Sequence, residues 1–335
     1  MRKLTLLLLF VSFQLVSYNQ VIIKGTILDK KTKEMVCFAT VYFDGTFVGT
    51  TSDRNGDFSL NIPHNAYMPL TVSSIGYYSV TLPDFSTNKP LTIYLKPKAY
   101  KIREVTVSDK SLVRKRKANL RLFKNVFIGT TENALSCEIT NEQDISFNYD
   151  SDSDTLKAFA SKPILIDNNA LGYKVTYYLD KFEYYRKSNS FLYKGNIIFN
   201  EDLASQTTDK QLYETKRKTA YLGSRMHFFR ALWANDLISA GFKVKSPSEE
   251  NLNCKDIVVQ ETCNLINPLS RNKKFLKYTT KLSVSYHSSL SEIIFLKPKV
   301  YFDEAGHFDL GINWEGEMAV MRTGDDLPYE YKMTE

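Results

Sequence analysis

The stretch "GTTSDRNGDFSLNIP", residues 49–63, decides how the first part of this chain folds. Its Asp-x-Asn-x-Asp spacing, which starts at Asp53, is found both in calcium loops and in tight turns between strands. A calcium loop of the EF-hand kind needs glycine at its sixth position and glutamate at its twelfth. Counting from Asp53, those positions hold Phe58 and His64. The spacing therefore predicts no metal here.

The same stretch carries a strong turn signal. Asn55-Gly56 is the dipeptide preferred in two-residue hairpin turns, because both residues tolerate a positive φ. After it, Phe58, Leu60 and Ile62 alternate with polar residues, which is the period of a half-buried strand. We therefore expect Asn55 and Gly56 to form a structural hairpin turn, with the neighbouring aspartates facing solvent.

The composition indicates a globular, β-rich protein. The chain has 335 residues, 43% hydrophobic and 24% charged, with 21 Tyr and 21 Phe, and this length suits about two domains. Aromatic and β-branched residues favour strands. The formal net charge of +7 is mild for this length, so we expect no nucleic-acid partner.

Residues 1–20 have the pattern of a secretory signal peptide. "MRK" is a basic start, "LTLLLLFVSFQLV" is an apolar core too short to span a membrane, and cleavage is expected near Ser17–Gln20. A buried N-terminal strand is the alternative interpretation. The signal predicts export, to the periplasm or to association with the outer membrane.

Residues 21–108 divide into short strand-like runs separated by turn residues such as Asp44-Gly45 and Asn55-Gly56. Seven such runs predict a seven-stranded Greek-key β-sandwich. The run of motifs G-T-I-L-D, A-T-V-Y-F, T-S-D-R-N-G-D-F-S-L, S-I-G-Y and I-R-E-V-T-V, the last with Ile102 and Glu104, resembles the carboxypeptidase regulatory-like domain of bacterial envelope proteins. That resemblance implies a transthyretin-like sandwich that acts as a non-catalytic accessory and binds carbohydrate or protein.

Residues 109–127, "DKSLVRKRKANLRLFKNVF", form a bridge with seven basic residues. Leucine, valine and phenylalanine recur in it at helical spacing. We expect a helical basic linker that faces water. The alternative is a patch, at residues 110–124, that contacts an anionic membrane surface.

Residues 128–335 predict a second, β-rich α+β domain with one long helix. The helical stretch is 209–242, with a possible break at Gly223-Ser224 and a C-cap at Gly241. "NNALGYKVTYYLDKF", "AYLGSRMHFFRAL" and "RTGDDLPYEY" resemble an uncharacterised group of exported proteins, and that resemblance implies no activity.

Linear catalytic motifs do not occur in the sequence. None of the four histidines starts an H-x-x-E or H-E-x-x-H zinc motif, and there is no G-x-S-x-G elbow, P-loop or dinucleotide fingerprint. Acids near Trp314, namely Asp303, Glu304, Glu315 and Glu317, can be drawn as a glycosidase pair, but turn acids are usually solvated. We expect no enzyme activity and no cofactor.

Several side chains remain candidates for ligand contact. Arg225, His227 and Arg230 can form an anion pocket, or they can belong to an amphipathic helix that covers a sheet. Tyr78 and Trp314 can stack on a glycan, or lie in the core.

Cys254 and Cys263, in "CKDIVVQETC", can form a local disulfide in an oxidising compartment. They stay apart if the run is one straight strand, because such a strand holds its ends roughly 30 Å apart.

The sequence thus predicts an exported, non-catalytic binding or scaffolding protein of the bacterial envelope, with a glycan or protein ligand. Two alternatives stay open. One is an accessory partner of an outer-membrane uptake system, and the other is a hydrolase without a recognisable linear motif.

Overall fold

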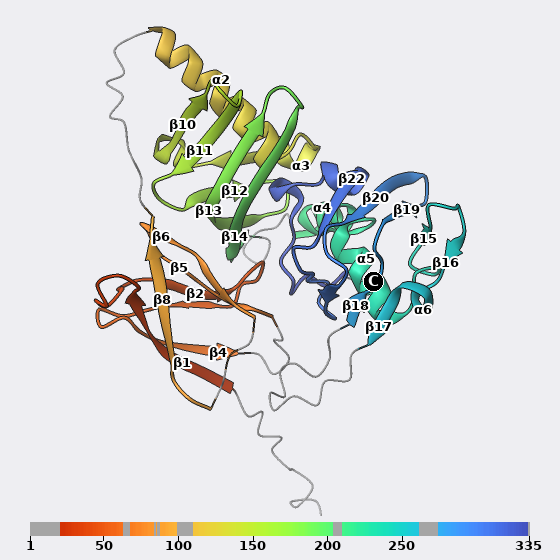
Figure 1. The fold of residues 1–335 in the computed structure, drawn as a ribbon, viewed down its shortest axis with the longest axis horizontal. Coiled ribbons are helices and arrows are strands. Elements are labelled where there is room, and N and C mark those ends of the chain that lie inside the picture. Colours follow the sequence, from red (N-terminus) through yellow and green to blue (C-terminus); the bar gives the residue numbers. More distant parts are fainter. Residues whose placement is uncertain are drawn as a thin grey trace, which may run out of the picture.

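The first strands build a two-sheet sandwich in the computed structural model, which describes residues 21–62, 68–83, 85, 88–98, 110–203, 210–260 and 274–333 (Figure 1). One sheet has the order β4-β1-β8-β6 and the other β3-β2-β5-β7. The strands are β1 (Val21–Asp29), β2 (Thr40–Phe43), β3 (Gly49–Thr51), β4 (Asp57–Ile62), β5 (Leu70–Ser73), β6 (Tyr77–Tyr78), β7 (Val80–Leu82) and β8 (Leu91–Pro97). The fold is mainly β as predicted, and the described part of residues 21–98 forms eight strands.

The turn at Asn55-Gly56 exists, but it does not close a hairpin. β3 and β4 belong to different sheets, so the turn carries the chain from one sheet to the other. Of the two turn residues only Gly56 has a positive φ, +74°. The Asp53 carboxylate accepts the backbone N–H groups of Asn55 (2.8 Å) and Asp57 (2.9 Å). This local side-chain bonding stabilises the turn. The hairpin prediction is wrong because β3 pairs with β2 and β4 pairs with β1, in two different sheets.

A separate six-stranded sheet, called the second sheet below, lies beyond the two sheets of the sandwich in Figure 1. Its order is β10-β11-β13-β12-β9, with β14 paired to β13. The strands are β9 (Cys137–Ile139), β10 (Ile145–Asp150), β11 (Thr155–Ala160), β12 (Ile164–Asn168), β13 (Tyr173–Tyr185) and β14 (Ser190–Asp202). The long β13–β14 pair continues from this sheet toward the sandwich.

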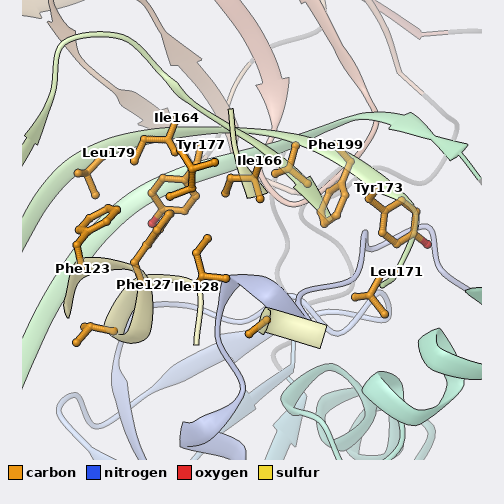
Figure 2. Packing of buried hydrophobic residues seen from close by; sticks show 14 of the residues in the cluster. Phe123, Phe127, Ile128, Ile164, Ile166, Leu171, Tyr173, Tyr177, Leu179 and Phe199 are labelled. Carbon is orange, nitrogen blue, oxygen red and sulfur yellow. The ribbon is translucent and has the colours of Figure 1, made fainter. Parts of the chain in front are cut away.

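The basic segment forms helix α2 (Lys110–Phe127), which crosses one face of this sheet (Figure 1). Phe123 and Phe127 are fully buried, and Figure 2 shows their rings pointing at Leu179 and Tyr177 on β13. The ring centroids of Phe127 and Tyr177 lie 4.7 Å apart. The second half of α2 is therefore part of the core rather than a solvated linker.

Helix α5 (Arg225–Ala234) and the strands that follow it form a third apolar core. Its sheets have the orders β16-β15-β19-β20-β22 and β17-β18-β21. The strands are β15 (Phe242–Lys245), β16 (Asn251–Leu252), β17 (Val258–Gln260), β18 (Lys274–Leu276), β19 (Lys281–Tyr286), β20 (Ser289–Phe295), β21 (Val300–Phe302) and β22 (Ile312–Gly316). Short helices are α3 (Glu132–Leu135), α6 (Cys254–Ile257) and α7 (Glu317–Val320), with 3-10 turns Glu142–Asp144 and Thr323–Asp325.

The predicted long helix is two helices, α4 (Lys210–Tyr221) and α5 (Arg225–Ala234). The break falls at Gly223-Ser224, where the Ser224 hydroxyl caps α5 by accepting the His227 N–H. The C-cap prediction at Gly241 is wrong: α5 ends at Asn235, whose φ of +58° is left-handed. Asparagine tolerates this conformation, so it closes the helix before the glycine is reached.

The segment "CKDIVVQETC" is not one straight strand either. It begins as helix α6, and the strand β17 covers only Val258–Gln260. Cys254 is buried, whereas Cys263 lies outside the residues that the structure describes. Residues 1–20, where a signal peptide is predicted, and residues 99–109, which hold the closing I-R-E-V-T-V motif, also lie outside them. No helix in the described part of the chain is long and apolar enough to cross a membrane.

Candidate functional site

The loop between β2 and β3 joins the sandwich to the second sheet. The Gly45 N–H donates to the Ile197 carbonyl (2.8 Å), and the Phe199 N–H donates to the Thr46 carbonyl (2.9 Å). Thr46 and Ile198 thereby form a parallel β-bridge. The Asp44-Gly45 turn, predicted only as a separator of strands, is thus a docking element that extends the β13–β14 pair.

The C-terminal segment covers the other side of this loop. The Tyr329 N–H donates to the Gly45 carbonyl (2.8 Å). The Arg230 guanidinium holds this segment through the carbonyls of Tyr329 (3.0 Å) and Tyr331 (2.8 Å), and it also donates to Ala305 (2.9 Å). Three stretches far apart in the sequence therefore meet at Gly45.

A second contact fixes the sandwich against β13. Lys98 and Asp180 form an ion pair at 3.1 Å, and their side chains are only 9% and 12% exposed. The Tyr178 hydroxyl donates to the Thr40 hydroxyl (2.7 Å), and its ring stacks on Tyr42 with centroids 5.7 Å apart. The two contacts place the sandwich in one defined orientation.

A cavity of about 250 Å³ lies at the meeting point. Its wall is formed by residues 44–45 of the sandwich, by β13 and β14, by the start of α5, by residues 306–308 and by the C-terminal residues 321–329. Every apolar core thus contributes to one site, and part of the wall comes from the N-terminal sandwich.

Three aspartates line this cavity. Asp325 accepts hydrogen bonds from the Thr131 hydroxyl and the Asn133 amide, and the other two, Asp44 and Asp326, have raised pKa values. Burial raises the pKa of Asp44 to about 7, although the Ile197 N–H donates to its Oδ1 at 2.6 Å, and Asp326 raises it further. Burial likewise raises the pKa of Asp326 to about 6, against the opposing effect of the Arg225 charge. The Asp326 side chain is 40% exposed, so water reaches it within the cavity while protein surrounds it. One of the two carboxyls can therefore hold a proton near neutral pH.

The start of α5 supplies the positive side of the cavity. The Arg225 guanidinium lies 3.7 Å from Asp326 and donates to the Met321 carbonyl (3.0 Å). Ser224, Arg225 and Met226 line the wall at the helix N-terminus, where free backbone N–H groups carry partial positive charge. Donors and acceptors thus face each other across the same space.

Aromatic rings and glycines shape the remaining wall. Tyr177, Tyr193 and Tyr329 line it. Gly195 allows the Tyr177 ring to lie close, because a Cβ at this glycine would stand 2.3 Å from that ring. Gly45, with φ +74°, likewise allows the Tyr329 ring to lie close, because a Cβ at this glycine would stand 2.5 Å from that ring.

Of the predicted contact residues on α5, only Arg225 lines the cavity. His227 is buried, its Nδ1 accepts the Gly223 N–H (3.1 Å), and burial together with Arg230 lowers its pKa to about 4. Arg230 uses its guanidinium on backbone carbonyls. The three side chains therefore do not form a common anion pocket.

The two predicted stacking residues lie elsewhere. Tyr78 is exposed on the sandwich, with the Lys98 ammonium 5.4 Å from its ring centroid. Trp314 packs against Phe228, Phe229 and Phe308, so it is a core residue. Among the acids drawn near it, Glu304, Glu315 and Glu317 are exposed, and Asp303 accepts the His307 N–H within its own turn.

Sequence reasoning missed Asp44, Asp326 and the tyrosines of the cavity. The available signal is weak: Asp326 stands in "RTGDDLPYEY", a stretch that matches no catalytic or binding motif. In the described part of the chain, no three His, Cys, Asp or Glu side chains are grouped as a metal site would require.

Comparison with known proteins identifies one part of the chain. Residues 23–107 match the family model of the CarboxypepD_reg-like domain. The resemblance seen in the motifs is thereby confirmed for this stretch, and the chain carries a carboxypeptidase regulatory-like domain. No curated protein matches the chain.

Proposed function

We propose that this chain, whose regulatory-like domain forms one wall of a partly open cavity, is an exported, non-catalytic envelope protein that binds a small glycan in that cavity. One observation carries the proposal: Asp44, from the regulatory-like domain, and Asp326 with Arg225, from the opposite side, face the same space. The docked domain is then a structural part of a binding site, which suits an accessory domain without chemistry of its own.

The composition of the wall supports a hydroxyl-rich ligand. Carboxylates accept hydrogen bonds from sugar hydroxyls, Arg225 and the α5 N-terminus donate to sugar oxygens, and the tyrosines offer flat apolar surface. The volume of about 250 Å³ is below the roughly 300–1,000 Å³ of pockets for drug-sized molecules. A ligand of one sugar residue, or the end of a longer glycan, fits this size.

Calorimetry of the full chain with a panel of neutral, amino and acidic monosaccharides tests the proposal. Asp326→Asn and Arg225→Gln should each weaken binding at least tenfold, about 1.4 kcal/mol, since each removes a charged hydrogen-bonding partner. Asp152→Asn is the matched control, because it removes the same charge from an exposed turn. Absence of binding to every sugar, or equal weakening in all three variants, would overturn the proposal.

A second candidate is a hydrolase, and the raised pKa values favour it. Acid–base catalysis works best with groups that titrate near the working pH, and two carboxyls with pKa values of about 7 and 6 share this cavity. Time-resolved proton NMR of the wild-type protein with bound saccharide separates the candidates. Unchanged ligand over hours supports binding alone, whereas conversion that stops in both Asp44→Asn and Asp326→Asn supports the hydrolase.

A further inference from the structure

The basic residues of α2 divide into two groups with different environments. Arg116 donates to the carbonyls of Ile145 (2.7 Å) and Glu142 (2.8 Å), and Lys124 pairs with the Glu142 carboxylate. These two residues fix the helix to its sheet. Arg114, Lys115, Lys117 and Arg121 are instead exposed, and none of these four forms an ion pair within the part of the chain that the structure describes.

The exposed group forms a stripe. Arg114, Lys117 and Arg121 follow each other at intervals of three and four residues, so they share one face of the helix. At 100° per residue this face lies opposite Phe123, which is buried against the sheet. Helix α2 contains no acidic residue. The outer face of the helix therefore carries positive charges and no negative charge.

Apolar side chains stand at the N-terminal end of the same helix. Leu112 and Val113 are 38% and 51% exposed, and they directly precede Arg114. At 100° per residue Val113 lies beside the stripe, about 70° from its middle, whereas Leu112 lies on the opposite side, with Phe123. In Figure 1 the N-terminal end of α2 reaches past the strands of the sheet that its second half covers. Nothing in the described part of the chain buries these two side chains as Phe123 and Phe127 are buried.

We propose that the outer face of α2 binds the surface of an anionic lipid bilayer. Polybasic segments are attracted to anionic lipid headgroups, and an interfacial helix adds apolar side chains that enter the boundary between headgroups and acyl chains. The Arg114–Lys117–Arg121 stripe provides the first property, and Val113 beside it provides the second. A bilayer fits both, whereas an acidic protein surface would need only the charges. This surface is separate from the cavity, so the inference does not depend on the glycan proposal.

Vesicle co-sedimentation of the folded full chain tests this surface. The probes are phosphatidylcholine vesicles with about 30% phosphatidylglycerol, and pure phosphatidylcholine vesicles. The wild-type protein should bind the anionic vesicles and not the neutral ones, and binding should weaken steeply as salt rises to about 0.5 M, because salt screens surface charges. Equal binding to both vesicles, or no binding at low salt, refutes the proposal.

Matched triple variants locate the contact. Arg114→Gln, Lys117→Gln and Arg121→Gln together should weaken binding about a hundredfold, since each basic residue near such a surface contributes about fivefold. Lys187→Gln, Lys218→Gln and Lys243→Gln remove the same charge from exposed positions elsewhere and should change binding by less than about threefold. Equal loss in both triples would show that net charge alone matters and would overturn the assignment to α2.

The apolar contribution has its own test. Val113→Gln keeps every charge and should weaken binding to anionic vesicles by several-fold if the side chain enters the lipid boundary. An unchanged affinity would refute insertion and favour an acidic protein partner instead. Far- and near-UV circular dichroism should be unchanged in all variants, because the substituted side chains face solvent. Should the triple variant unfold, the single substitution Lys117→Gln carries the test, with an expected loss of about fivefold.

Discussion

Gly56→Ala should destabilise the N-terminal sandwich more than an exposed turn substitution normally does. Gly56 has φ +74°, a left-handed conformation that L-residues with a Cβ rarely adopt. A Cβ at this position would also stand 2.7 Å from the Ile27 carbonyl oxygen. That oxygen already accepts the Val36 N–H at 2.9 Å, so it cannot move without weakening a second hydrogen bond.

The expected magnitude is the sum of two contributions. The left-handed conformation costs about 1–2 kcal/mol for a residue with a Cβ. The close contact forces a shift of a hydrogen-bonded carbonyl, and a weakened buried hydrogen bond costs about 1 kcal/mol more. Gly56→Ala should therefore reduce the free energy of unfolding of the sandwich by about 2–3 kcal/mol, and Gly56→Val by more, because its branched Cβ fits a positive φ worse.

Gly76→Ala isolates the first contribution. Gly76 has φ +82°, and a Cβ there meets no atom within 4 Å. This variant should lose only about 1–2 kcal/mol. Asp53→Asn keeps the Oδ1 atom that accepts two backbone N–H groups, and it should stay within roughly 0.5 kcal/mol of the wild type.

Native-state hydrogen exchange of the β1 and β4 amides measures these differences, because it reports the local free energy of opening. Fluorescence of Trp233 and Trp314 serves as an internal control, since both indoles pack in the third core. If Gly56→Ala is no more destabilising than Gly76→Ala, the close approach to Ile27 is wrong. If calcium instead raises the melting temperature by many degrees and Asp53→Asn abolishes that rise, the stretch is a metal loop after all.

Further predictions concern the core, the cavity, the domain contact and export. Phe123→Ala should lower the free energy of unfolding in urea by about 3–5 kcal/mol, because Phe123 is buried in the core beneath α2. A decrease below about 1 kcal/mol would mean that this part of α2 is a solvated linker. The raised pKa of Asp44 means that the folded protein keeps a proton between pH 3.8 and about 7 that the unfolded chain has lost, so this group lowers stability as pH rises through that window. Asp44→Asn should therefore match the wild type near about pH 4 and melt at a higher temperature at about pH 8, and a constant difference across that range would contradict the assignment. Lys98→Met leaves Asp180 buried without its partner and should cost about 3 kcal/mol, with recovery in the double variant Lys98→Met/Asp180→Leu. Mass spectrometry of the mature protein should place its first residue at about 18–22, and an intact Met1 on the folded protein would rule out the predicted export signal.

Local patterns predicted the half-buried strand β4, the helix break at Gly223-Ser224 and the domain family. Alternation of Phe58, Leu60 and Ile62 requires a half-buried strand, because successive side chains point to opposite faces, and these residues are buried on β4. The break at Gly223-Ser224 was also readable, because serine caps a helix start through a hydrogen bond to its own next turn. Such features depend on residues close together in the chain.

The partners across space could not be predicted this way. The Asn55-Gly56 dipeptide predicts a turn. Whether the strand after the turn joins the same sheet or the opposite one depends on how the two sheets pack against each other. From the sequence alone, His227 and Arg225 are equally plausible as residues that contact a ligand. Their environments differ because His227 lies on the buried side of α5 and Arg225 lines the cavity.

The sequence by itself determined the β-rich composition, the regulatory-like domain and the positions of most turns, since these follow from local propensity and short-range hydrogen bonding. Only the tertiary structure decided that Asp44 and Asp326, 282 positions apart in the printed sequence, face one cavity. The raised pKa values of both groups are a property of that assembly, because burial of a charge depends on the atoms that surround it in space and not on its neighbours along the chain.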